Sequence, residues 1–144
     1  MISNLVNQAQ DEYHNRVFPK DEIMSSSFII YHNPRCSKSR QTLELLQENN
    51  ISPEIILYLE NTPSKSDLKN ILGKLGISAR DLLRKGEEEY KQHELQNESL
   101  TEDQIIEAMI SSPKLIERPI VVEGERAVLG RPPENVLNLI SASE

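Results

Sequence analysis

The fold of this chain is decided by residues 28–59, which read FIIYHNPRCSKSRQTLELLQENNISPEIILYL. Residues 28–31 are a short apolar run closed by an Asn-Pro pair, which is typical of a buried strand that ends in a turn. Residues 37–49 contain no glycine or proline and carry leucines on one stripe, so they predict a helix. A second apolar run follows at 55–59. A strand-helix-strand unit of this length normally places two parallel strands side by side with a right-handed crossover.

The residues after this unit predict a helical segment and then a second part of the sheet. Capping boxes begin at Ser64 and Thr101, each followed by an apolar stripe at helical spacing, and Gly76 ends the first of these helices. A further short helix is expected from Ser78. The last part of the chain is expected to form two strands at 120–122 and 127–129, a turn at Gly124, and a helix that starts at Pro132 and Pro133.

This order of elements predicts an α/β fold. We expect a thioredoxin-like mixed sheet with a helical insertion between the βαβ and ββα halves. A chain of 144 residues is long enough for one well-buried core and too short for two ordinary domains. Residues 1–26 are polar and lack a clear core pattern, so we expect a flexible N-terminal extension followed by a single domain over residues 27–144.

The composition excludes several classes of protein. Hydrophobic residues at 37% and charged residues at 27% are typical of a soluble globular protein, and no apolar run approaches the ~20 residues that span a bilayer. A formal net charge of −7 argues against a protein that binds nucleic acid by neutralising phosphates. The N-terminal residues do not form a signal peptide pattern. We expect a cytoplasmic protein, and a monomer, with neither a membrane nor a nucleic acid as its partner.

The negative charge is concentrated in one part of the chain. Residues 87–107 contain eight acids and one base, whereas the remaining residues contain 15 acids and 15 bases. The acidic excess therefore lies in the expected helical insertion, away in sequence from the basic stretch at 32–40. An acidic protein can in this way keep a cationic pocket for an oxyanion.

The chain has one cysteine, Cys36, at the junction of the first expected strand and the first expected helix. A lone cysteine forms neither an internal disulfide nor a cysteine-only metal site. A helix start offers free backbone N–H groups and the positive end of the helix dipole, and both favour a thiolate or a bound oxyanion. A buried, inert thiol is the alternative. The neighbours favour the reactive thiolate because they are polar or cationic: His32, Asn33, Arg35, Ser37, Lys38, Ser39 and Arg40.

Three arginines later in the chain, Arg84, Arg118 and Arg131, are candidate anion-binding residues. Arg84 follows a pair of leucines, and the other two each directly precede a proline. Arginine is preferred to lysine where planar, bidentate contacts to an oxyanion are needed. Spacing alone does not show that the three converge on one thiolate. We expect no metal site, because His32 and Cys36 alone are too few ligands.

Six blocks of this sequence are similar to one known family. The blocks are residues 31–40 (YHNPRCSKSR), 56–60 (ILYLE), 76–80 (GISAR), 82–85 (LLRK), 117–122 (ERPIVV) and 130–132 (GRP). In this order and spacing they resemble the glutaredoxin-dependent arsenate reductases of the ArsC type, and the similarity covers residues 28–140. Ser37-Lys38 stands where resistance-type reductases often have Gly-Thr. This difference makes the chain look closer to the chromosomal, less characterised branch of the family.

The resemblance implies a reaction and a role for each residue of the site. In the family, one essential cysteine attacks arsenate, a histidine four residues before it helps to hold the thiol as thiolate, and three arginines bind the oxyanion. These roles fall on Cys36, on His32, and on Arg84, Arg118 and Arg131 of this sequence. The family holds no bound cofactor. It takes glutathione as a co-substrate and glutaredoxin as a protein partner, and it releases arsenite.

Further site residues and one backbone feature are expected beside these. Asn33, Ser39 and Arg40 surround the thiol in sequence and are candidate substrate-binding residues. The peptide bond between Arg118 and Pro119 is expected to be cis, because thioredoxin-like proteins typically have a cis-proline before this strand.

Two other functions share parts of this pattern. A Cys-x5-Arg phosphate loop, as in thioredoxin-coupled reductases and low-molecular-weight tyrosine phosphatases, is excluded because residue 42 is threonine. An Spx-type regulator that binds RNA polymerase often carries Cys-x-x-Cys, and this chain has Ser39 at the second position. The regulator therefore remains as one alternative. A thiol-redox protein that acts on another substrate is the second.

Overall fold

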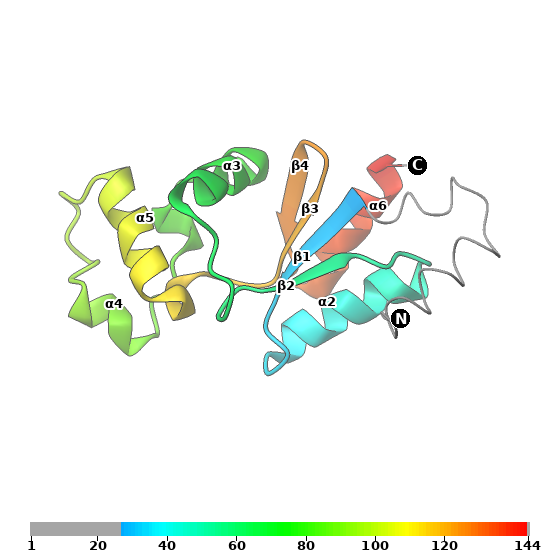
Figure 1. Ribbon diagram of the computed structural model, residues 1–144, viewed down its shortest axis with the longest axis horizontal. Coiled ribbons are helices and arrows are strands. Elements are labelled where there is room, and N and C mark those ends of the chain that lie inside the picture. The colour runs from blue at the N-terminus through cyan, green and yellow to red at the C-terminus, as the bar shows by residue number, and fades with distance from the viewer. Residues whose placement is uncertain (1–26, 144) are drawn as a thin grey trace.

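The computed structural model describes residues 27–143, which form one mixed four-stranded sheet with helices on both faces (Figure 1). The expected extension at 1–26 lies outside the described residues. The strands lie in the order β2-β1-β3-β4. Their bounds are β1 Phe28–His32, β2 Glu54–Leu57, β3 Ile120–Glu123 and β4 Arg126–Leu129.

The helices follow the order that the sequence predicts. Helix α2 joins the first two strands, α3 to α5 form the insertion, and α6 ends the domain (Figure 1). None of the helices in the described part of the chain is long and apolar enough to cross a membrane. The bounds are α2 Ser37–Glu48, α3 Lys65–Leu75, α4 Glu88–Gln92, α5 Glu102–Ser111 and α6 Val136–Ser143, with 3-10 turns at Arg80–Leu82, Pro113–Leu115 and Pro133–Asn135.

The strand pairing confirms the predicted fold class. Strands β1 and β2 are parallel, with Ile30 opposite Ile55, as the strand-helix-strand unit requires. Strand β3 pairs antiparallel with β1 and with β4. The β3-β4 hairpin turns through Gly124, whose φ of 61° lies in the left-handed region that glycine adopts without strain. The result is the thioredoxin-like α/β sheet with its helical insertion.

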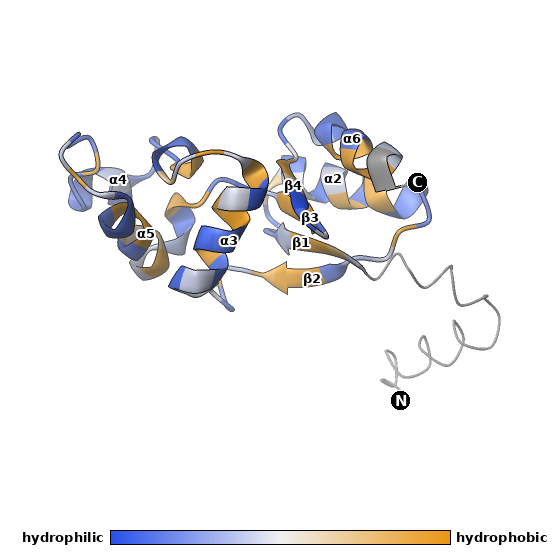
Figure 2. Cartoon of the chain, turned by 90° about the horizontal axis from the view of Figure 1, so that it is seen from above, coloured by the Kyte–Doolittle hydropathy of each residue, from blue (hydrophilic) through white to orange (hydrophobic). Residues whose placement is uncertain are grey.

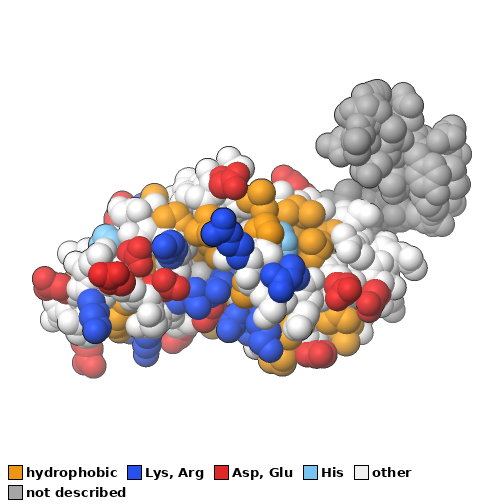
Figure 3. Space-filling view, turned by 90° about the horizontal axis from the view of Figure 1, so that it is seen from below, with side chains coloured by type: hydrophobic (Ala, Val, Ile, Leu, Met, Phe, Trp, Pro, Cys, Tyr) orange, Lys and Arg blue, Asp and Glu red, His pale blue; other side chains and the backbone are white. Residues whose placement is uncertain are grey.

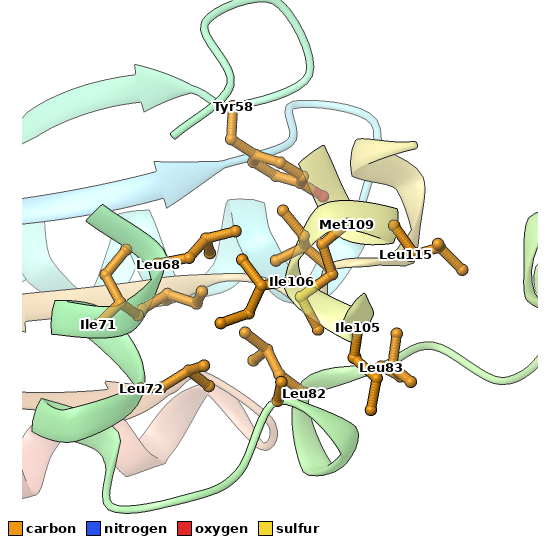
Figure 4. Packing of buried hydrophobic residues seen from close by; sticks show 14 of the residues in the cluster. Tyr58, Leu68, Ile71, Leu72, Leu82, Leu83, Ile105, Ile106, Met109 and Leu115 are labelled. Atoms are coloured by element: carbon orange, nitrogen blue, oxygen red, sulfur yellow. The ribbon is translucent and has the colours of Figure 1, made fainter. Parts of the chain in front are cut away.

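The two faces of the sheet are covered by different helices. Phe28 and Ile30 of β1 pack with Val121 of β3 against α2 and α6. The alternate residues Ile29 and Tyr31 face the other core, which α3 and α5 build. Figure 2 shows the apolar strips on these helices, and Figure 4 shows side chains of α3 and α5 that point toward one another. Helices therefore bury both faces of β1 and β3, whereas Ile55 on the edge strand β2 is exposed.

The ends of the insertion helices confirm the predicted caps. Ser64 and Thr101 each form a complete capping box with the backbone and side chain three residues on, namely with Asp67 and Gln104. Gly76 ends α3 in the left-handed conformation, with φ 72°.

Four elements differ from the sequence prediction. Strand β2 ends at Leu57 rather than residue 59, because the backbone N–H groups of Glu60 and Asn61 both donate to the Leu57 carbonyl and turn the chain. The helix expected from Ser78 is only a 3-10 turn, and α4 was not predicted. Pro132 leads into a 3-10 turn, so the last regular helix begins four residues later, at Val136.

Candidate active site

Cys36 is the residue directly before α2, at the N-cap position of the helix. Its backbone N–H donates to the Asn33 carbonyl at 3.0 Å, which closes a turn after β1. Its carbonyl accepts the first helical hydrogen bond, from the Arg40 N–H at 3.0 Å. The thiol is partly exposed at the positive end of the helix.

The surroundings of Cys36 lower the pKa of its thiol. Partial burial raises that pKa, but hydrogen bonds from the backbone N–H groups of Ser39 and Lys38 lower it, as do the Arg118 charge and the Arg131 side chain. Arg131 Nη1 lies 3.9 Å from Cys36 Sγ. The net shift is downward, which favours the thiolate that a nucleophile requires.

His32 contacts the active-site loop through Ser39 rather than through the sulfur. Its ring is 6% exposed, and Nδ1 lies 2.6 Å from Ser39 Oγ. Burial, helped by the charge of Arg40, lowers the pKa of His32, so the ring is neutral at neutral pH. A neutral ring adds no positive charge beside Cys36. The structure connects His32 to Ser39, whose backbone N–H hydrogen-bonds to the thiol, and the predicted help of His32 in holding the thiolate stays a prediction.

The other polar residues predicted at the site stabilise the loop itself. Ser39 is fully buried, and its hydroxyl accepts from the Asn33 N–H at 3.0 Å. The Asn33 side chain accepts from the Arg35 N–H at 3.0 Å. Arg40 Nη1 donates to the Pro34 carbonyl at 2.9 Å. The structure thus engages the side chains of Asn33, Ser39 and Arg40 within the loop, and their predicted contact with substrate stays a prediction.

The three predicted arginines converge on one carboxylate oxygen, Glu117 Oε1. Arg118 Nη1 lies 3.3 Å from it, Arg84 Nε lies 3.4 Å from it and Arg131 Nε lies 3.7 Å from it. Arg131 reaches from this oxygen to the sulfur of Cys36. The three arginines therefore form one cluster beside the thiol. Their spacing in the sequence alone did not show this convergence.

A backbone bridge brings Arg84 to this cluster from the helical insertion. Leu83 and Ile116 form an isolated antiparallel bridge. The Arg84 N–H donates to the Leu115 carbonyl at 2.8 Å, and the Glu117 N–H donates to the Leu82 carbonyl at 2.9 Å. Because Leu82, Leu83, Leu115 and Ile116 are buried, this contact is fixed by the core of the insertion.

A close approach at Gly130 places Arg131 against the start of α2. A Cβ atom on Gly130 would lie 2.8 Å from Pro119 Cγ and would overlap with the Thr42 hydroxyl. The Gly130 N–H donates to the Pro119 carbonyl at 2.9 Å, and Arg131 Nη1 donates to the Arg118 carbonyl at 3.2 Å. The peptide bond after Arg118 is cis, as predicted, and so is the bond after Arg131. Only glycine fits this junction.

One guanidinium nitrogen of the cluster has no hydrogen-bond partner. Arg118 Nε is buried and donates to no partner within the described part of the chain. The side chain as a whole is 12% exposed. A buried N–H donor without a partner costs free energy.

The sequence analysis missed two acids at this site. Glu87 lies 2.6 Å from Arg84 Nη1, and Glu117 lies at the centre of the arginine cluster. Glu87 belongs to the acidic stretch 87–107, which is separate in sequence from the cationic residues around Cys36, yet in space its carboxylate contacts one of the three arginines. The local signals were an acid three residues after Arg84 and an acid directly before Arg118. Figure 3 shows Lys and Arg side chains near the middle of one face, with acidic side chains around them.

The site carries no metal-binding cluster. In the described part of the chain, no group of three or more His, Cys, Asp or Glu side chains could hold a metal ion. The chemistry available at the site is that of a thiolate beside an arginine cluster.

The chain is thus a thioredoxin-like protein that carries one thiol at a helix start, beside a cluster of three arginines. Residues 31–139 match the model of the ArsC family. The chain is 51% identical over 118 residues to an uncharacterized protein of Escherichia coli K12, YfgD, covering 81% of this chain and 99% of YfgD. It is 47% identical over 115 residues to an arsenate reductase of Haemophilus influenzae, covering 79% of this chain and 99% of that protein.

A solved structure agrees with this assignment. The arsenate reductase from Vibrio cholerae is 49% identical to this chain and superposes with a TM-score of 0.76, covering 77% of this chain and 95% of that one. The chain therefore belongs to the ArsC family.

Proposed function

We propose that this protein is an arsenate reductase that uses glutathione and glutaredoxin and forms an arsenic adduct on Cys36. One observation carries the proposal: the thiol lies at the N-terminus of α2 with the guanidinium of Arg131 3.9 Å away, in a cluster with Arg84 and Arg118. A thiolate and a tetrahedral oxyanion repel each other. Guanidinium and helix N–H groups at this position offset that repulsion. The names of the relatives in Haemophilus and Vibrio support arsenate as the oxyanion.

The first step forms the bond between sulfur and arsenic. The Cys36 thiolate attacks the As(V) centre, and one arsenate oxygen leaves as water after it takes up two protons. Arg131, which lies 3.9 Å from the sulfur, is proposed to contact an arsenate oxygen as well, and Arg118, whose Nε has no partner among the described residues, is proposed to donate to a second oxygen. Charge that builds on the oxygens in the transition state is stabilised by these donors.

The reducing electrons come from two outside thiols, because the chain has one cysteine. Glutathione displaces a second oxygen as water and forms a mixed Cys36-arsenic-glutathione adduct. A glutaredoxin thiolate then attacks the glutathione sulfur, and the electron pair of the arsenic-sulfur bond reduces As(V) to As(III). Water releases arsenite from Cys36, and glutaredoxin leaves as a mixed disulfide with glutathione. This coupling fits a monomer in the cytoplasm, where the glutathione pool is reduced.

The test is arsenite production from arsenate with purified protein, glutathione and glutaredoxin. We expect turnover that depends on all three additions and that Cys36→Ser abolishes. Arg131→Lys is expected to lower kcat/KM, because the single ammonium group of lysine cannot make the two separate contacts that the planar guanidinium of Arg131 makes. Arg126→Lys is the matched control, since Arg126 is exposed on β4 and contacts Glu123 and the Leu139 carbonyl instead.

Two results would point to the other functions. Equal arsenite production by the wild-type protein and Cys36→Ser would refute the mechanism. Absence of turnover, together with co-purification of RNA polymerase, would favour the Spx-type regulator. Thiol turnover that does not depend on arsenate would favour a redox protein with another substrate.

A further inference from the structure

Glu117 is a carboxylate at the centre of the anion site, and neither the sequence motifs nor the proposed reaction gives it a role. Its Oε1 atom lies between 3.3 and 3.7 Å from one nitrogen of each of Arg84, Arg118 and Arg131. We propose that Glu117 sets the charge that this site accepts, so that the arginine cluster favours a singly charged oxyanion over a doubly charged one. The proposal deepens the proposed function, because it takes the arginine cluster to be the oxyanion site.

The charges in contact around the cluster support this assignment. Three guanidinium groups meet the carboxylate of Glu117, and one of them also meets Glu87 at 2.6 Å. The two acids offset two of the three arginine charges, and the Cys36 thiolate, 3.9 Å from Arg131, offsets the third. Arg40, the next arginine along the loop, donates to the Pro34 carbonyl and not to the cluster. The site therefore offers much less positive charge than its three arginines alone would, and an anion of charge −2 loses more by this than an anion of charge −1.

The position of Glu117 makes it act on the bound anion and not only on the arginines. One of the arginines that it contacts, Arg131, also reaches the Cys36 sulfur at 3.9 Å, and the Glu117 side chain is 25% exposed. An oxyanion that binds to the free Nε of Arg118 would lie close to this carboxylate. Repulsion between the two grows with the charge on the oxyanion. The carboxylate therefore discriminates by charge at a site where the arginines alone favour the higher charge.

A backbone contact explains why Glu117 is held there. Its N–H donates to the Leu82 carbonyl at 2.9 Å, beside the buried bridge of Leu83 and Ile116. The backbone of Glu117 is thus held beside the insertion by this hydrogen bond, independently of the contacts that its carboxylate makes with the arginines. For this reason we expect Glu117→Gln to keep the fold.

Two permanent anions of similar shape but different charge test the proposal without turnover. Sulfate carries two negative charges near neutral pH, and methanesulfonate carries one. Each anion is titrated at constant ionic strength, and its binding is measured as protection of Cys36 from alkylation by iodoacetamide. Each protein is compared with its own rate without anion, which removes any change in the reactivity of the thiol itself.

Glu117→Gln is expected to raise the affinity for sulfate more than the affinity for methanesulfonate. Removing one unit charge about 4 Å from the anion in a water-like medium changes the ratio of the two affinities by about fivefold, and more if the site is drier. Glu117→Asp keeps the charge and is expected to keep a ratio close to that of the wild-type protein. Glu123→Gln removes an equal charge on β3, where the carboxylate meets Arg126, and is expected to change neither affinity.

Several results would overturn the proposal. In Glu117→Gln they are an unchanged ratio of the sulfate affinity to the methanesulfonate affinity, an equal change of both affinities, or a loss of binding of both anions. An equal rise of this ratio in Glu117→Asp, or no protection by either anion in any of the proteins, would overturn it as well. If Glu117→Gln does not fold by circular dichroism, Glu117→Thr takes its place with the same expectation. Arsenite production in the coupled assay is scored separately. Failure of arsenate reduction with a charge-dependent ratio intact would therefore refute the proposed substrate and not the role of Glu117.

Discussion

Gly130→Ala is expected to destabilise the protein and to disturb the active site at the same time. The added Cβ would overlap with the Thr42 hydroxyl and lie 2.8 Å from Pro119 Cγ, whereas ordinary van der Waals contacts begin near 3.4 Å. Thr42 is fully buried in α2, and Pro119 lies in the cis-proline loop, so neither neighbour is a flexible surface group. The backbone of β4 must therefore move away from α2.

The size of the effect follows from two opposing contributions. Overpacking a buried position costs about 1–3 kcal/mol, and replacing glycine by alanine stabilises by about 0.4–1 kcal/mol through the unfolded chain. We expect the free energy of unfolding to fall by about 1–2 kcal/mol. The chain has no tryptophan, so urea unfolding is followed by far-ultraviolet circular dichroism.

Gly73→Ala is the matched control for this change. Gly73 lies in α3, and a Cβ there would meet no atom within 4 Å. Alanine at an exposed helical position is expected to raise the free energy of unfolding by about 0.5–1 kcal/mol. Gly130→Ala should also slow the alkylation of Cys36 at neutral pH, because Arg131 moves with its neighbour. Gly73→Ala should leave that rate unchanged.

A double variant tests whether Thr42 causes the clash. Adding Thr42→Ala to Gly130→Ala removes both Thr42 atoms that the new Cβ would meet. The combined loss should be smaller than the sum of the single losses by at least about 0.5 kcal/mol. A Gly130→Ala protein as stable as Gly73→Ala, or strictly additive losses, would refute the reasoning.

Three further predictions concern the thiol and the loop that holds it. Arg131→Gln should raise the pKa of Cys36, because it removes the side chain that donates to the sulfur, and alkylation at pH 7 should slow. Ser39→Ala should lower the free energy of unfolding by about 1–3 kcal/mol, since the buried hydroxyl is the partner of His32 and of a backbone N–H. Because the pKa of His32 is lowered in the folded state, the stability that comes from its neutral ring is complete above about pH 6.5 and is lost as the pH falls below that value. His32→Gln should therefore make the free energy of unfolding, measured by urea titration, depend less steeply on pH in this range.

Each of these predictions has a control and a contrary result. Arg126→Gln should not change the pH dependence of Cys36 alkylation. An unchanged pH dependence in Arg131→Gln would show that Arg131 does not lower the pKa of the thiol. Ser66→Ala, at an exposed position of α3, should change stability by less than about 0.5 kcal/mol. A similarly small change in stability for Ser39→Ala would show that the Ser39 hydrogen bonds do not stabilise the fold. An equal slope between pH 5 and about 6.5 in His32→Gln would show that another group sets the pH dependence.

The local elements of this fold could be predicted because their causes lie close together in the chain. The capping boxes at Ser64 and Thr101, the glycine that ends α3 and the glycine in the hairpin turn all satisfy backbone groups within a few residues. The apolar run of β1 was also readable, although its alternate residues serve two different cores. The end of β2 was misplaced because apolar residues continue past Leu57 while the backbone turns.

Part of the active site could also be predicted from the sequence. The sequence places Cys36 at a helix start, gives it cationic neighbours and contains the three arginines that the family resemblance singles out. The contact between Ser39 and His32 could not be predicted, because it depends on how the loop folds back after β1. The position of Glu117 among the arginines was missed as well. Its three arginine partners come from segments that only the bridge at Leu83 and the close approach at Gly130 bring together.

The element order, the single thiol and the number of charged groups follow from the residues alone, since each depends on residue identity and on hydrogen bonds made within a few residues. Which charges meet depends instead on the tertiary fold. Electrostatic interactions act through distance in space, and residues 84, 117 and 131 are separated along the chain by more than ten residues each. The fold brings the three arginines to one oxygen atom of Glu117, and this contact is the basis of the proposed anion site.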